Sequence, residues 1–191
     1  MDLLPIYRSA VRQFDARIRV VRPEQWSVST PDDDWDVQRL VRHVIVGQAT
    51  VPDVLAGRAP TRLPIDAQTP GPELVEFWSS ASPAAVAALT ALSSLDTPVK
   101  LPEGTVPAVE LGWRLAIDLT VHAWDLARAI NAPDEFPNDL LAHVLDQAKQ
   151  SADRWFPAER YATPIPVPGC TDDLTELLAL TGRNRWWRRQ T

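Results

Sequence analysis

Two residues stand out because their side chains could bind a metal ion together. Asp118 and His122 lie four residues apart in the stretch 111–131, LGWRLAIDLTVHAWDLARAIN, which has few helix-breaking residues. At 3.6 residues per helical turn, the carboxylate and the imidazole lie about 40° apart around the helix axis. We therefore expect both groups to project from the same side of one long helix.

The side of the helix that carries this pair is otherwise apolar, with Leu111, Leu115, Leu126 and Ala129 on it. Burying a polar group costs roughly 2 to 7 kcal/mol unless the group finds a partner. A bound metal ion would be one partner, and a hydrogen bond within the core would be another. Because Asp–His pairs at this spacing also occur as plain helix hydrogen bonds, the spacing alone favours the structural pairing.

A third candidate ligand, His43, lies on a second predicted helix, about residues 37–56, together with Gly47 one turn further on. A glycine inside a helix costs roughly 1 kcal/mol relative to alanine. Room for a bound group, or for a close neighbouring helix, would explain why it is tolerated. Three protein ligands and an open position are typical of catalytic zinc sites. Two imidazoles and a carboxylate also suit iron, nickel or manganese.

Charged residues beyond His122 allow two interpretations. Asp125 and Arg128 could orient a metal-bound imidazole from behind. Equally, both could join Arg114 in an ordinary salt-bridged edge. His143 falls on the opposite side of its own helix from the apolar residues, so we expect it to be solvated.

The elements that would position these residues are mostly helices. Apolar periodicity predicts helices over 3–21, 37–56, 111–131, 137–155 and 172–181, the last capped by Thr171. A further helical stretch begins at Glu73, and Pro83 either kinks it or starts a second helix. Residues 95–106 fit a short hairpin or a loop, and 58–72 and 157–170 are proline-rich loops. The pattern predicts an all-α fold, most simply a four-helix bundle with a short additional C-terminal helix.

Composition narrows the class of protein. The 191 residues suit a single domain, 1–191, with a basic, tryptophan-containing tail at 183–191. No apolar run approaches the roughly 20 residues that span a bilayer, and a net charge of −6 argues against nucleic acid as a partner. The lone Cys170, which we interpret as a bystander thiol, and the missing signal pattern favour a cytoplasmic protein.

Three blocks of sequence resemble a known family. TPDDDWDVQRLVRHVIVG, residues 30–47, resembles the first signature of the metal-binding domain at the N-terminus of mycothiol-dependent maleylpyruvate isomerases, which belongs to the DinB-like superfamily. DLTVHAWDLARAI, residues 118–130, resembles its second signature. LLALTGR, residues 177–183, is similar to a C-terminal motif of an uncharacterised actinobacterial branch. The combination of the first two blocks is much more specific than either alone.

The resemblance implies a DinB-like four-helix bundle that holds a divalent metal, zinc first and nickel second, at His43, Asp118 and His122. Asp118 stands where the isomerase has a glutamate. Many relatives carry a cysteine shortly after the Thr-Pro of the first block, where this chain has Asp32. The isomerase also has a further C-terminal domain that contributes to its active site, which we do not expect here. Maleylpyruvate isomerisation therefore does not carry over, whereas a metal site and a link to low-molecular-weight thiols do.

Two classes of function follow as hypotheses. The first is a metal-dependent transferase that activates a thiol of the mycothiol type for attack on a small electrophile, with Trp35, Trp124 and the loops 24–34 and 58–72 walling the pocket. The same metal could instead activate water for hydrolysis. The second is a non-catalytic module that binds a metal, a ligand or a partner. Its apolar loops and Trp-Trp tail would then form a homodimer or partner surface.

Overall fold

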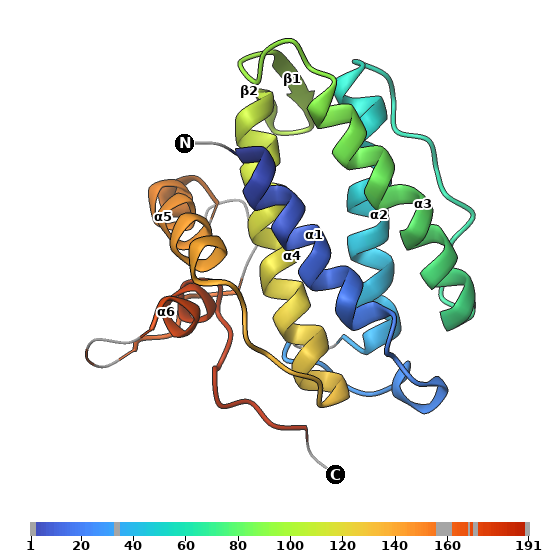
Figure 1. Ribbon diagram of the computed structural model, residues 1–191, viewed down its shortest axis with the longest axis vertical. Coiled ribbons are helices and arrows are strands. Elements are labelled where there is room, and N and C mark those ends of the chain that lie inside the picture. Colours follow the sequence, from blue (N-terminus) through green and yellow to red (C-terminus); the bar gives the residue numbers. More distant parts are fainter. Residues whose placement is uncertain (1–2, 33–34, 156–161, 168, 170–171, 190–191) are drawn as a thin grey trace.

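A computed structural model describes residues 3–32, 35–155, 162–167, 169 and 172–189, and it confirms the all-α prediction. Its elements are listed here in chain order: α1 Leu3–Ile18, the 3-10 turn η1 Pro23–Gln25, α2 Val37–Leu55, α3 Gly71–Thr90, β1 Pro98–Leu101, β2 Gly104–Pro107, α4 Ala108–Ile130, α5 Asn138–Trp155 and α6 Asp173–Leu180. Figure 1 shows long helices side by side, with a small hairpin at one end.

The first four helices form the bundle. α1 lies along α4, α2 lies along α3, and α2 also contacts α4. α5 and α6 pack on each other beside α4, on the side away from α3 (Figure 1). The predicted four-helix bundle with a short C-terminal helix therefore describes the molecule well, and α5 is the second addition to the bundle.

α4 is the central helix and is buried on nearly every side. From Leu115 to Ile130 only Asp118 and Arg128 are not fully buried. A helix that is apolar all round belongs in the interior of a protein. A partly exposed carboxylate at Asp118 therefore marks a place where the surface dips to reach this helix.

The helix ends follow from local chemistry. Asp36 caps α2, as its side chain accepts a hydrogen bond from the Arg39 amide at 2.7 Å, and Asn131 closes α4 in the left-handed conformation, with φ 57°. α6 is capped by Asp172, because the Asp172 carboxylate accepts from the Thr175 amide. The predicted cap, Thr171, lies outside the described residues, as does Cys170.

Some predicted boundaries were wrong. α1 ends at Ile18 rather than residue 21, because the amides of Val20 and Val21 bond to carbonyls three residues back instead of four. Pro83 and Pro52 lie inside α3 and α2, and neither divides its helix.

Residues 98–107 form the hairpin rather than the loop. β1 pairs with β2 in an antiparallel register that sets Val99 opposite Val106. Pro102 and Glu103 form its turn, and β2 leads directly into α4. The hairpin therefore stands at the N-terminal end of α4 (Figure 1).

The C-terminal segment is attached to the rest of the chain through several of its arginines. Arg183 is buried, Arg185 donates to Asp134 at 2.6 Å, and Arg189 donates to the Ala129 carbonyl. Arg183 is thus enclosed, Arg185 is partly buried, and Arg189 keeps an exposed side chain while it contacts α4. Trp187 packs against the core while Trp186 stays exposed.

Among the described helices, none is long and apolar enough to cross a membrane.

Candidate metal centre

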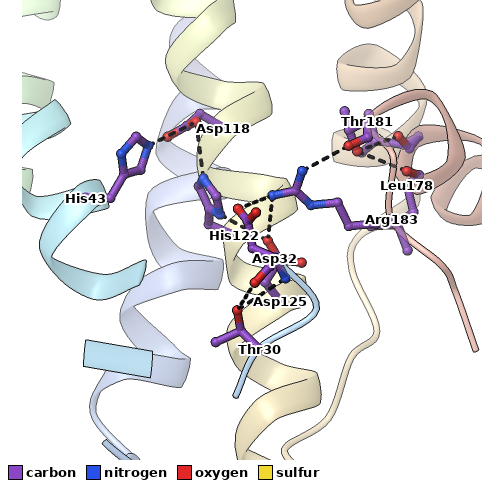
Figure 2. A network of polar contacts seen from close by, with 10 residues as sticks. Thr30, Asp32, His43, Asp118, His122, Asp125, Leu178, Thr181 and Arg183 are labelled. Carbon is purple, nitrogen blue, oxygen red and sulfur yellow. Dashed lines mark hydrogen bonds and ion pairs between the residues drawn. The ribbon is translucent and has the colours of Figure 1, made fainter. Parts of the chain in front are cut away.

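The structure brings the three predicted ligands together. Asp118 Oδ1 lies 3.7 Å from His43 Nε2 and 3.4 Å from His122 Nε2. One ligand atom from each of the three residues lies within 4.8 Å of the other two. His43 comes from α2 and the other two from successive turns of α4, so contact between these helices creates the cluster (Figure 2).

The cluster lines a cavity of about 700 Å³. His122 forms its floor, with only 4 % of its side chain exposed, whereas 29 % of Asp118 and 47 % of His43 are exposed. Gly47 also lines the cavity, and a Cβ built on it would meet nothing within 4 Å. The open space expected beside the His43 imidazole is therefore present.

Trp35 is the aromatic wall of the site. Its ring stacks on the His122 imidazole with a centroid distance of 5.8 Å and lies 4.9 Å from the His43 ring. Trp124 lines no part of the cavity and is fully buried. It lies two residues beyond His122, and two residues on a helix are about 200° apart, so its side chain points into the core.

The two predicted loops contribute unequally to the walls. Asp32, from the loop before α2, lines the cavity. From the loop 58–72, Ile65 lines a separate groove that shares Trp35, His43 and Gly47. The hairpin supplies the wall that sequence reasoning missed, through Leu101, Pro102 and Glu103.

Asp125 orients His122, as one of the two sequence interpretations proposed. Its Oδ2 lies 3.0 Å from His122 Nδ1. A carboxylate only accepts, so the imidazole carries its proton on Nδ1 toward Asp125, and this contact turns Nε2 toward Asp118. Arg128 has no part in this arrangement, because it donates to the Trp187 carbonyl at 2.7 Å.

The electrostatics of the cluster favour positive charge. Burial acts to lower the pKa of His122, but Asp118 and Asp125 outweigh it and raise that pKa. Burial acts to raise the pKa of Asp118, but His122 and His43 outweigh it and hold that pKa well below its usual range. The carboxylates therefore favour a cation at this place, and a proton on the imidazole would compete with a metal for it.

A buried arginine lies behind His122. Arg183 Nη2 donates to Asp125 Oδ2 at 3.3 Å and also to Asp32, while its Nη1 donates to the Thr181 carbonyl at 2.9 Å (Figure 2). Burial raises the pKa of Asp32, and Arg183 offsets only part of that effect. Asp32, His122 and Asp125 are close enough together to suggest a second metal cluster, but the Arg183 guanidinium already supplies their cation.

A second arginine stands at the hairpin side of the cavity. Arg114, one turn before Asp118, donates to Glu103 at 2.5 Å and to Glu110 at 2.6 Å. The salt-bridged edge considered from the sequence therefore exists at Arg114, but its partners are these two glutamates. The contact joins α4 to the hairpin turn and fixes that wall of the cavity.

The donors present fit a divalent metal. Two imidazole nitrogens and one carboxylate oxygen match catalytic zinc sites and also suit nickel. They converge on a cavity with open space on the Gly47 side, which leaves room for a further ligand.

The fold and this site agree with a family assignment. The sequence profile of the mycothiol maleylpyruvate isomerase N-terminal domain matches residues 7–127, which include all three candidate ligands. The chain belongs to this family.

Individual relatives extend the comparison. An uncharacterized protein found in two strains of Mycobacterium tuberculosis is 29 % identical over 186 residues, which cover 96 % of this chain and 98 % of the relative. A crystal structure of the mycothiol-dependent maleylpyruvate isomerase aligns with a TM-score of 0.66 at 17 % identity, over 83 % of this chain and 72 % of that one. A histidine-to-alanine mutant of the same isomerase aligns with a TM-score of 0.65 at 16 % identity, over 86 % and 74 %. These two structures confirm the DinB-like fold.

Proposed function

We propose that this protein is a metal-dependent thiol transferase, which uses a low-molecular-weight thiol of the mycothiol type and acts on a small electrophile. One observation carries the proposal: His43, Asp118 and His122 present their ligand atoms within 4.8 Å of one another at the wall of a cavity of about 700 Å³. Membership of a family named for a mycothiol-dependent isomerase supports the choice of a thiol.

The accessibility of the cluster favours catalysis over a purely structural metal. Structural zinc sites are closed by four protein ligands, whereas catalytic ones keep a position open. Here three protein ligands converge, and the His43 side chain is nearly half exposed to the cavity. A metal held there would have space beside it for a thiol.

The division of labour follows from the side chains. His43, Asp118 and His122 would hold zinc or nickel, and the bound metal would favour the thiolate form of the thiol, which is the nucleophile. The Trp35 ring packs against both imidazoles and gives the site an apolar wall. Gly47 leaves room for the thiol. In the transfer, the thiol gives up its proton and its sulfur forms a bond to an electrophilic carbon of the second substrate. The bond from that carbon to a halide or to an epoxide oxygen breaks at the same time and the leaving atom takes the electron pair. With an activated alkene the π electrons move to the neighbouring carbon, which takes up a proton.

Thiol binding to the cobalt-loaded protein tests this proposal. Mycothiol, glutathione and cysteine would each be titrated into the chain while the visible spectrum of cobalt is recorded. The same samples would then be assayed for conjugation with epoxides, alkyl halides and activated alkenes. We expect at least one thiol to change the spectrum and to be consumed with an electrophile.

The matched variants are His43→Ala and His143→Ala. His143 lies on α5, where its Nδ1 contacts the Asp139 carbonyl, far from the cluster in the sequence. We expect His43→Ala to lose the thiol response and His143→Ala to keep it. A metal-loaded protein that binds none of the thiols and conjugates none of the electrophiles would overturn the transferase proposal.

A further inference from the structure

The segment after α6 reaches into the site from a distant part of the sequence. Arg183 lies 58 residues beyond Asp125 and 56 beyond the end of the family match at residue 127. Only 5 % of its side chain is exposed. A buried guanidinium is costly unless it is paired, so the position of this residue needs an explanation.

The chain turns sharply at the end of α6 to send Arg183 inward. The Thr181 hydroxyl donates to the carbonyls of Leu177 and Leu178 and closes the last turn. Gly182 then adopts a φ of +78°, which L side chains rarely adopt. A Cβ on Gly182 would also lie 2.5 Å from the Ala162 Cβ and 2.9 Å from its backbone. The Thr-Gly-Arg sequence therefore fixes the direction in which the arginine points.

Arg183 meets the residue that orients His122. Asp125 is fully buried, and its Oδ2 accepts from both His122 Nδ1 and Arg183 Nη2, while its Oδ1 finds no hydrogen-bond partner among the described residues. The same guanidinium nitrogen donates to Asp32, which lines the cavity. One guanidinium nitrogen thus contacts both carboxylates while the other is held by the Thr181 carbonyl. A lysine side chain ends one bond short of that first nitrogen and has no second nitrogen to be held.

We infer that Arg183 is a positioning residue for the metal centre: it holds Asp125, and through Asp125 it fixes the Nδ1–H tautomer and the orientation of the His122 imidazole. The C-terminal segment, beyond the part of the chain that matches the family profile, thereby completes the site. The part of this role that concerns a metal rests on the proposed function. The effect of Arg183 on the His122 ring does not depend on a metal.

The decisive comparison uses Arg183→Lys beside Arg185→Lys. Both arginines lie on the same segment and both pair with aspartates. Arg185, however, donates to Asp134, and in the described part of the chain Asp134 contacts neither Asp125 nor the three candidate ligands. Lysine keeps the charge, but its ammonium ends one bond short of the position of Nη2 and lacks the second nitrogen that the Thr181 carbonyl holds. Equal helix content of both variants by circular dichroism would show that each still folds.

The ring protons of histidine give a direct readout. The chain has only three histidines, so selective 15N labelling of histidine yields few ring signals. In the metal-free wild type and in Arg185→Lys, we expect a downfield, slowly exchanging signal for His122 Nδ1–H. In Arg183→Lys this signal should broaden or disappear. Cobalt affinity should fall about 10- to 100-fold in Arg183→Lys and less than twofold in Arg185→Lys, as for other contacts that orient metal ligands.

The outcomes separate this inference from the proposed function. Retention of the His122 signal in Arg183→Lys, or an equal loss in both variants, would overturn the role of Arg183 even if the wild type binds cobalt and thiol. Loss of the signal in Arg183→Lys alone would support that role. A wild type that binds no cobalt would contradict the proposed function, and the ring signal would still decide whether Arg183 orients His122.

Discussion

At the scale of single residues, the site depends on how one imidazole is held. His122 has one nitrogen on Asp125 and the other toward Asp118, so neither ring flip nor tautomer exchange is compatible with both contacts. Among the described residues of α2, none makes a hydrogen bond with the His43 imidazole, and this side chain is nearly half exposed. His122 is therefore the fixed ligand of the cluster, and His43 is the ligand that faces the cavity.

We predict that Gly47 lacks a side chain because ligand binding needs the space, and that folding does not need a glycine there. A Cβ there meets no other atom within 4 Å, so Gly47→Ala should stabilise α2, by up to about 1 kcal/mol in the free energy of unfolding. Gly47→Leu should keep the metal but weaken thiol binding, because its longer side chain would extend into the cavity. Urea denaturation and titration of the cobalt form with thiol measure the two effects. Equal thiol affinity in both variants would contradict a thiol site beside Gly47.

The candidate ligands could be found from the sequence because each lies in a regular helix. Helical spacing placed Asp118 and His122 on one side of α4, and the same rule identified Asp125 as one turn further on. Spacing could not decide between a metal and a core hydrogen bond. Trp124 was misplaced because its aromatic character suggested a pocket wall, whereas its angular position on α4 directs it into the core.

At the scale of the elements, α4 positions most of the site and the other helices support it. The helices contact one another through hydrogen bonds as well as through apolar side chains. The Trp78 indole of α3 donates to Asp15 of α1 at 2.9 Å, and Arg19 donates to the other oxygen of the same carboxylate at 2.8 Å. The contact between Trp78 and Asp15 therefore joins α3 to α1.

The Asp15 contact predicts a specific dependence of stability on pH. Burial acts to raise the pKa of Asp15, but hydrogen bonds from Arg19 and Trp78 outweigh it and lower that pKa. A lowered pKa gives stability that is present above the unfolded pKa of about 3.9 and is lost as the pH falls through the folded value. Asp15→Asn should therefore be less stable than the wild type at pH 7, by up to about 1 kcal/mol for this partly exposed group.

Urea denaturation at pH 7, 5 and 3 measures the effect. The difference between wild type and Asp15→Asn should be similar at pH 7 and 5 and should narrow at pH 3. A difference that stays constant over all three values would mean that the ionised carboxylate is not what stabilises the contact.

The sequence did not predict the parts of the site that depend on contacts between different elements. Residues 95–106 fitted a hairpin or a loop equally, because four-residue strands carry little periodicity. The contact of Glu103 with Arg114 connects the hairpin to α4 across 11 residues, and that of Asp32 with Arg183 spans 151. Local spacing contains no signal for such pairs, although the unusual Thr-Gly-Arg end of α6 marks a turn.

At the scale of the whole molecule, the bundle has a core that does not depend on a metal. Its buried apolar residues extend through all six α-helices described. The candidate metal site lies at the edge of this core, on the cavity side of α2 and α4. The fold should therefore persist when metal is removed, unlike that of small zinc domains, which unfold without it.

Metal removal tests that expectation. A chelator should leave the helix content by circular dichroism unchanged and should lower the melting temperature. Zinc at a free concentration 100 times its dissociation constant stabilises the native state by about 2.7 kcal/mol, which corresponds to roughly 5–10 °C for a chain of this size. Collapse of the helical signal on chelation would instead indicate a structural metal.

The most direct test of the account is the metal content of the purified protein. Elemental analysis would be carried out on the wild type, on His43→Ala and on His143→Ala after loading with zinc or nickel and removal of excess metal. We expect about one metal per chain in the wild type and in His143→Ala, and a large loss in His43→Ala with unchanged helix content. A wild type that retains no zinc or nickel would contradict the account and would leave Asp118 and His122 as a hydrogen-bonded pair at the edge of the core.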